Sequence, residues 1–346
     1  MRIQGQGKSL KLELSASKLG ISSYANRSST NFEIVTASTI KIHVPRGLFS
    51  QDELRELTEP STTLNRVIIG SYLGLGLVLV VYVMSPTSTS IAGTLVLFVS
   101  LPAIQYRLLH AAHESVHQDS HSRAKYALRN KIFLYWPLGL TPSFRQEHLA
   151  HHRHFGDPSR DPDASIYERT LDSRLNLVTF VLEGFLGIAA LRQVLRRLNT
   201  AASESSKPRH FIELAIFHLI LILMAVAVGH LFLYLAWVLS LSTIVKGFSQ
   251  LRGLAEHGRQ LQGPYVLRSF LDNSSFARFV GNTGFRHHAE HHLYPNVPFE
   301  RLDLIRRRIL RLGECSQDTR ETIEFYNGNH FSILKLWCKP LLKATS

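Results

Sequence analysis

The sequence predicts an all-α integral membrane protein with four transmembrane helices, arranged as two hairpins, and a cytoplasmic helical cap. No charged residue occurs from Val67 through Tyr106, and Glu213 is the only charge from Phe211 through Val245. Each stretch exceeds the roughly 20 residues that cross a bilayer core, so each can hold a helical hairpin. All 39 lysines and arginines lie outside these stretches. The positive-inside rule therefore places the N-terminus, the central segment and the chain after the second hairpin in the cytoplasm.

The elements follow in order along the chain. Residues 1–60 are rich in Ser and Thr and are expected to form a flexible tail, although an organelle transit peptide has a similar composition. Residues 61–315 are expected to form one membrane-bound domain, and residues 316–346 a C-terminal tail. The expected spans are Val67–Met84, Ile91–Leu109, Ile212–Val228 and Leu231–Lys246.

Nine histidines gather just outside the expected spans, and they dominate the functional interpretation. In residues 148–152 and again in residues 288–292, three histidines follow the i, i+3, i+4 spacing of one helical face. A single histidine on a helical face is usually a packing residue, but this repeated spacing favours metal binding, because imidazole is the commonest metal ligand. The candidate ligands are His113, His117, His148, His151, His152, His257, His288, His291 and His292.

The number and position of these histidines indicate the chemistry. Nine imidazoles are too many for one four-coordinate zinc, and they suit two metals with four or five ligands each. Imidazole accepts zinc, copper, iron or nickel, so the ligand type alone leaves the metal open. A site beneath membrane helices can reach a hydrocarbon chain in the bilayer. Unactivated C–H bonds need an oxidising metal centre, which a pair of irons provides.

Polar residues near the histidines are candidates for orienting the ligand rings through their second ring nitrogen. The aspartates among them could instead cap helices, which is their usual role. Three further histidines are expected not to bind metal: His154 is off the register, His218 is a packing residue, and His287 is a neighbour of the ligands. The candidate orienting residues are Glu114, Asp161, Asp163, Glu256, Glu290 and Asn282.

Three segments are not expected to cross the membrane. Ile132–Leu140 is too short and contains Pro137, so it is interpreted as an interfacial or re-entrant piece. Leu175–Leu191 is nearly long enough, but one more crossing would separate the histidine clusters; an amphipathic helix in the interface is expected instead. Glu300–Leu312 is amphipathic, and both a membrane-surface helix and a docking site for a partner are open.

The motifs HESVH, HLAHH and HHAEHHLYPNVP, together with the single histidine of RGLAEH, resemble those of the membrane-bound fatty acid desaturase superfamily. The resemblance covers roughly residues 61–315. It implies an O₂-dependent oxidoreductase with a non-haem di-iron site, in which the nine histidines hold two iron ions. Members of this superfamily form a double bond in an acyl chain. One departure is Gly253, at the position where animal stearoyl desaturases carry an asparagine.

The resemblance also implies an electron donor. No HPGG motif of a fused cytochrome b5 domain occurs, so a separate donor of the ferredoxin or cytochrome b5 type is expected. The net charge of +13 suits an acidic protein partner and anionic lipid headgroups. No nucleic-acid partner is expected, since no recognised binding motif occurs.

Three functions compete. The leading one is a desaturase acting on a fatty acyl chain, and the second is a hydroxylase or ketolase acting on a carotenoid or another lipid hydrocarbon. The third is a membrane protein that binds or transports metal. A transporter should have its polar residues near the bilayer midplane, whereas these histidines lie outside the spans, which disfavours the third function.

Overall fold

The computed structural model describes most of the membrane-bound domain expected from the sequence. The described residues belong to one compact unit within residues 37–346. Residues 1–47, most of the expected C-terminal tail, and Asn282 lie outside them. The described residues are 48–84, 91–118, 125–141, 143–155, 157, 159–163, 174–203, 208–257, 267–270, 286–312 and 323–326.

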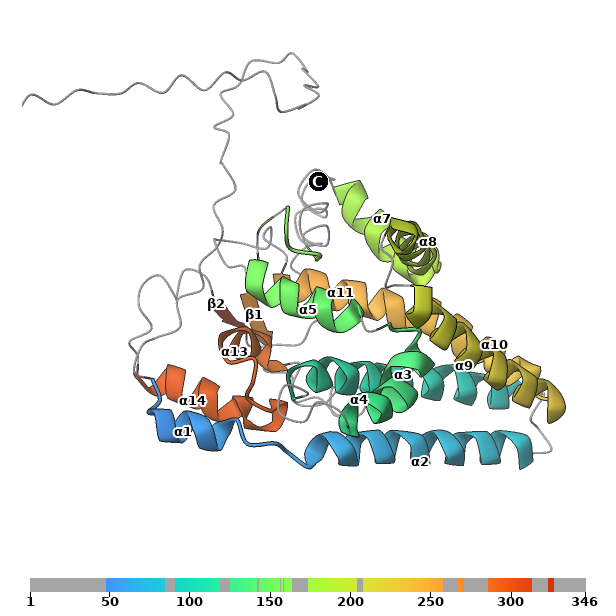
Figure 1. Cartoon of the computed structure of the whole chain (residues 1–346), viewed down its shortest axis with the longest axis horizontal. Coiled ribbons are helices and arrows are strands. Elements are labelled where there is room, and N and C mark those ends of the chain that lie inside the picture. The colour runs from blue at the N-terminus through green and yellow to red at the C-terminus, as the bar shows by residue number, and fades with distance from the viewer. Residues whose placement is uncertain are drawn as a thin grey trace, which may run out of the picture. The chain divides into compact units, whose positions relative to one another are not determined.

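The first hairpin consists of α2 (Thr63–Met84) and α3 (Ile91–Gln118), which pack side by side (Figure 1). On α2, Leu73, Leu77 and Val80 are each more than half exposed. A helix that is apolar all round and still exposes large aliphatic side chains suits a lipid environment.

The length of α3 carries it beyond a bilayer. Its 28 residues extend about 42 Å, whereas the hydrocarbon core is roughly 30 Å thick. Its last turns, with His113 and His117, therefore project past the apolar stretch.

The second hairpin begins with α9 (Pro208–Ala227) and returns through α10 (Leu231–Ser240). A π-helical turn, η3 (Leu241–Val245), joins α10 to α11 (Lys246–His257), so the returning helix is effectively continuous. His257 is the last residue of α11. The ends of α11 and α3 that carry histidines therefore lie on the same side of the two hairpins.

Among the described residues, three helical segments are long and apolar enough to cross a membrane, namely Thr63–Val83, Arg209–Ala227 and Leu231–His257, and the bent pair Val178–Phe185 and Ile188–Arg196 makes a fourth if it is taken as one span. The three segments overlap the expected first, third and fourth spans, although the last continues to His257, beyond the expected end at Lys246. The expected second span is the first part of α3, which is not among the three segments found in the described residues. The chain is thus a helical protein with membrane-length apolar helices, and the four-span topology stays a prediction.

The expected interfacial helix at Leu175–Leu191 is divided in two, so the prediction of one continuous helix is wrong. The structure has α7 (Arg174–Phe185) and α8 (Ile188–Ser203), bent by 82° relative to each other. Gly187 lies at the bend with a φ of 77°, a value that glycine adopts without steric cost.

Helix α7 packs closely against α11 through two glycines. A Cβ atom on Gly184 would lie 2.8 Å from Cα of Gly247, and one on Gly247 would lie 2.5 Å from Cδ1 of Phe185. The missing side chains therefore allow the two backbones to approach, and α7 supports the helix that carries His257.

The segment expected to be interfacial or re-entrant is a pair of short turns, η1 (Lys131–Tyr135, π-helical) and η2 (Trp136–Leu138, 3₁₀), which follow α4 (Lys125–Asn130). The indole of Trp237 donates to the Pro137 carbonyl over 2.8 Å. Nε2 of His218 lies 3.0 Å from the Trp136 carbonyl oxygen. His218 is thus a hydrogen-bonded packing residue, as expected.

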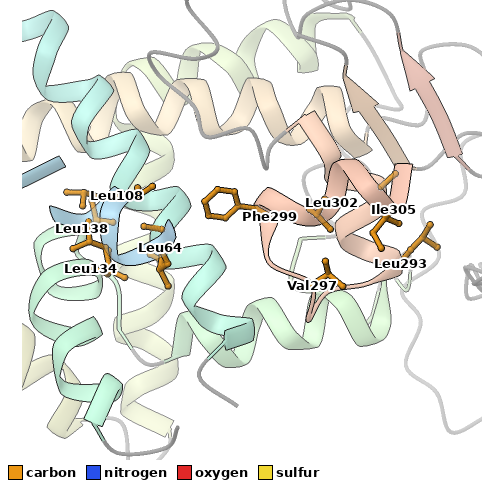
Figure 2. Packing of buried hydrophobic residues seen from close by; sticks show 14 of the residues in the cluster. Leu64, Leu108, Leu134, Leu138, Leu293, Val297, Phe299, Leu302 and Ile305 are labelled. Atoms are coloured by element: carbon orange, nitrogen blue, oxygen red, sulfur yellow. The ribbon is translucent and has the colours of Figure 1, made fainter. Parts of the chain in front are cut away.

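The core joins the hairpins to the C-terminal helix α14 (Leu302–Leu312), which follows η6 (Phe299–Arg301) (Figure 2). On α14, Leu302, Ile305 and Ile309 are buried at helical spacing. The apolar face of this amphipathic helix therefore packs into the protein's own core. The sequence had allowed two other roles for this face, contact with a membrane surface or docking of a partner.

Helix α1 (Gln51–Leu57) begins with a capping box, in which Ser50 and Glu53 bond each other's backbone amides. Arg301, which directly precedes α14, forms hydrogen bonds with the other end of α1. The guanidinium of Arg301 donates to the carbonyl groups of Glu56, Leu57 and Glu59 at 2.7, 3.1 and 3.0 Å.

A two-stranded parallel sheet interrupts the otherwise helical structure, and the all-α prediction does not include it. Strand β1 (Leu267–Phe270) pairs with β2 (Ile323–Tyr326), with Leu267 opposite Ile323. Each strand has four residues. Such short strands show no clear alternation, and their pairing joins segments far apart in the sequence.

The contact between α7 and α11 yields a stability prediction. We expect Gly247→Ala to lower the free energy of unfolding by about 1–3 kcal/mol, because the new methyl overlaps the Phe185 ring. Gly74→Ala is the matched control, since a Cβ there meets no atom within 4 Å. The thermal midpoint in detergent measures both, and equal midpoints for the two variants would contradict the close packing.

Candidate metal centre

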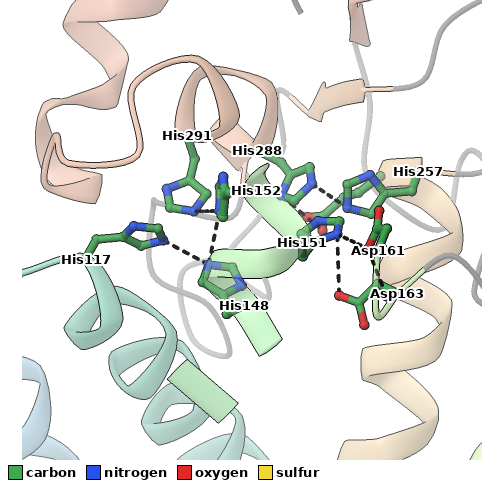
Figure 3. Close-up of polar contacts among 10 residues, drawn as sticks. His117, His148, His151, His152, Asp161, Asp163, His257, His288 and His291 are labelled. Carbon is green, nitrogen blue, oxygen red and sulfur yellow. Dashed lines mark hydrogen bonds and ion pairs between the residues drawn. The ribbon is translucent and has the colours of Figure 1, made fainter. Parts of the chain in front are cut away.

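Four helices bring the nine candidate histidines together. The end of α3, α5 (Ser143–His154), the end of α11 and the short helix α13 (His288–Leu293) converge around them. Figure 3 shows His117, His148, His151, His152, His257, His288 and His291 of this set. The sequences of α5 and α13 are helical as expected, so each presents three imidazoles on one face. α13 ends two residues before Pro295, which cannot continue a helix.

The first group contains five histidines. His113, His148, His152 and His291 each offer a ring nitrogen, and these nitrogens all lie within 4.8 Å of one another. Nε2 of His148 lies 3.1 Å from Nε2 of His152, which is itself 3.1 Å from Nε2 of His291. His117 joins them, because its Nε2 lies 2.9 Å from Nε2 of His148.

The second group contains the remaining four. His151, His257 and His292 offer ring nitrogens within 4.8 Å of one another. His288 lies with its Nε2 2.9 Å from Nε2 of His257. α5 and α13 contribute to both groups, so the two groups are adjacent.

The donor set fits a pair of metal ions. Two nitrogens bound to one ion at about 2.1 Å lie roughly 3–4 Å apart, which matches the separations within each group. Neutral imidazoles can satisfy one another only in donor–acceptor pairs, and three or more converging nitrogens exceed that. Both ring nitrogens of His292 are buried without a hydrogen-bond partner among the described residues. Both groups can thus hold a metal, while the role of each histidine as a ligand stays a prediction.

Burial keeps most of these imidazoles neutral, as metal binding requires. The pKa values of His148, His152 and His291 lie well below the usual range. The main cause is removal from water, and repulsion from the neighbouring histidines adds to it. Burial, followed by the charge of Arg145, lowers the pKa of His117 to about 4.

His151 has the opposite shift, because it faces two aspartates (Figure 3). Its Nδ1 lies 2.9 Å from Oδ1 of Asp161 and 3.8 Å from Oδ2 of Asp163. Burial alone lowers the pKa of His151, but the hydrogen bond with Asp161 and the charges of both aspartates outweigh it, and the net shift is upward. This arrangement leaves Nε2 free to face the second group, as in carboxylate–histidine–metal sites.

Glu256 is the second carboxylate beside a candidate ligand. Its Oε2 lies 3.4 Å from Nδ1 of His288, and its Oε1 accepts from Nε of Arg252 over 2.7 Å. Arg252 therefore holds Glu256 next to the ring. The sequence interpretation missed Arg252, although its i, i+4 spacing to Glu256 on one helix is a usable signal.

The two remaining glutamates among the candidate orienting residues contact groups other than the candidate ligand rings. Oε1 of Glu114 accepts from the backbone amide of Phe299 over 3.2 Å, which ties α3 to the start of η6. Glu290 is buried against His287, Ser269 and Arg306. Glu290 thus contacts the neighbouring histidine of its own segment, where the sequence suggested a ligand ring.

Three other residues named from the sequence are not part of the two histidine groups. His154 and His287 belong to neither group, and that they do not bind metal stays a prediction. Asn282 lies outside the described residues.

Two residues that the sequence interpretation missed, Ser269 and Arg306, are buried beside α13. No local sequence pattern marks Ser269 as a residue of the site. Arg306 could have been noticed, because it interrupts the apolar face of α14, which is an unusual position for a charge.

Asp161 gives a mutational prediction. We expect Asp161→Asn to weaken Fe²⁺ binding about 10–100-fold, because the charge that favours the bound tautomer of His151 is lost. Asp163→Asn is the control, since its carboxylate is half-exposed and 3.8 Å away. Competition with a chelator measures both affinities, and similar losses would show that Asp161 has no specific role.

The metal-free protein is expected to lose stability below pH 6.5. His148, His152 and His291 have folded-state pKa values below the ordinary 6.5, so the unfolded chain takes up protons that the folded chain does not. This contribution to the free energy of unfolding is therefore fully present above pH 6.5 and is lost as the pH falls. Each such histidine increases the unfolding equilibrium constant by up to about tenfold per pH unit.

His151 opposes this trend, because its raised pKa stabilises the fold below 6.5. More histidines have a lowered pKa than a raised one, so the net effect of acidification is a loss of stability. Thermal midpoints measured with chelator between pH 7 and pH 5 test the prediction, and a midpoint that rises on acidification would refute it.

The family comparison agrees with this geometry. The family model described as fatty acid desaturase matches residues 89–319, which is more than half of the chain and includes all nine histidines. No curated protein matches the sequence. With its buried histidine groups that can hold metal ions, its membrane-length apolar helices and this match, the chain belongs to the fatty acid desaturase family.

Proposed function

We propose that the protein is an O₂-dependent membrane desaturase that introduces a double bond into a fatty acyl chain at a site with two iron ions. The observation that carries the proposal is the division of nine buried or half-buried histidines into adjacent groups of five and four. Membership of the fatty acid desaturase family supports an oxidoreductase acting on a lipid.

The residues of the chain have distinct tasks in this proposal. The nine imidazoles hold the metals, while Asp161 and Glu256 orient His151 and His288 through their second ring nitrogens. When bound, the iron pair supplies, with O₂, the oxidising power that removal of hydrogen from an unactivated methylene requires. Burial of most of the ligand side chains excludes water from the reacting centre.

The position of the site supports a hydrocarbon substrate. The histidines lie at the ends of α3 and α11, directly after long apolar segments. An acyl chain in the bilayer can thus reach the metals at one end of these helices. We place this end on the cytoplasmic side, because the lysines and arginines lie outside the apolar stretches.

An external protein is proposed to supply the two electrons that the reaction needs. The net charge of +13 favours an acidic donor of the ferredoxin or cytochrome b5 type.

Expression in a host of defined lipid composition tests the proposal. We expect a new unsaturated fatty acid in the methyl ester profile, and its loss in His291→Ala. His154→Ala is the matched control, because His154 lies on α5 but in neither histidine group. An unchanged acyl profile together with an oxygenated carotenoid would instead identify a hydroxylase or ketolase.

Iron content provides the second measurement on the same proteins. The wild type and His154→Ala should purify with close to two irons per chain, while His291→Ala should contain less. Equal iron in all three would exclude His291 as a ligand, and a wild-type protein without iron would refute the di-iron proposal.

A further inference from the structure

Helix α13 carries ligands for both metal positions, yet it is too short to be stable alone. It has six residues, whereas isolated helices shorter than about 12–15 residues are marginal in water. His287, its N-cap residue, forms no side-chain capping bond. His291 belongs to the first group, and His288 and His292 to the second. The position of α13 must therefore be set by contacts with other elements.

Ser269 of β1 supplies the missing cap. Its hydroxyl oxygen accepts from the backbone amide of Ala289 over 2.9 Å, which satisfies one of the free amides in the first turn. The same hydroxyl donates to Oε2 of Glu290. One serine, held in a strand by pairing with β2, thus bonds both the backbone and a side chain of α13.

The other oxygen of Glu290 faces two further partners. Oε1 lies 3.3 Å from Nδ1 of His287 and 3.7 Å from Nη1 of Arg306 on α14. Nε of Arg286 donates to Nε2 of His287 over 3.2 Å. His287 therefore accepts at Nε2 and carries its proton on Nδ1, from which it donates to Glu290.

Glu290, His287 and Arg306 are all removed from water. The exposed fractions of Glu290, His287 and Arg306 are 0%, 1% and 2%. A buried carboxylate is tolerated only when paired and hydrogen-bonded, and loss of one partner leaves the other charge uncompensated. The cluster is thus a strong constraint on the helices that contribute its members.

We propose that Ser269, His287, Glu290 and Arg306 form a clamp that positions α13 and, through it, His288, His291 and His292. Glu290 and Arg306 are positioning residues in this clamp, since they act on the metals only through the helix. The inference rests on the proposed function in one respect, namely that these three histidines bind iron.

Hydrogen–deuterium exchange of the metal-free protein tests the clamp directly. We expect Glu290→Gln and Arg306→Met each to speed amide exchange in residues 288–293 about tenfold or more, while residues 143–154 of α5 exchange as in the wild type. The double variant should lie closer to the wild type than either single one, because neither charge is then unpaired.

Arg308→Met is the matched control, since Arg308 lies on α14 but pairs with Glu53 of α1 at 3.6 Å. It should leave exchange in α13 unchanged. Faster exchange throughout the chain in Glu290→Gln would indicate general destabilisation and overturn the clamp, as would unchanged exchange in α13.

Fe²⁺ affinity provides the functional readout. We expect Glu290→Gln to bind Fe²⁺ about 10–100-fold more weakly than the wild type, with Arg308→Met unaffected. A loosened α13 with unchanged Fe²⁺ affinity would show that the clamp does not position ligands. A wild type that binds no Fe²⁺ would refute the proposed di-iron function, and the exchange measurement would still decide whether the clamp holds α13.

Discussion

Nine imidazoles packed nitrogen to nitrogen, most of them buried, form the constraint around which this protein is arranged. Burial keeps most of them neutral, and neutral rings in such numbers cannot satisfy one another by hydrogen bonds alone. The arrangement is favourable when shared cations bind the converging nitrogens. Each surrounding element can then be understood by how it brings a histidine to the site and keeps it there.

The elements achieve this in different ways. Helices α3 and α11 carry candidate ligands at their ends, after apolar stretches, so the length of each apolar stretch determines where these histidines lie along the helix. Helix α5 has 12 residues, presents three histidines and packs against α3. Helix α13 is too short for this and depends on its contacts with β1 and α14.

Several features arise only from contacts between distant segments. The bend between α7 and α8 follows from a glycine with positive φ, and the close approach of α7 to α11 depends on Gly184 and Gly247. The apolar face of α14 is used in the core, together with a buried arginine. Local periodicity predicts such helices and their faces, but it does not say which surface covers each face.

The sequence by itself determined the helical class, the apolar stretches and the nine histidines, because helical spacing and hydropathy are local properties of the chain. It also separated His287 from His288 by register alone. The tertiary structure decided how the histidines divide into two groups, which carboxylate faces which ring, and that Glu290 bonds β1 and α14. These are relations between distant segments, such as His152 and His291, which are 139 residues apart, and no local pattern encodes which distant side chains meet.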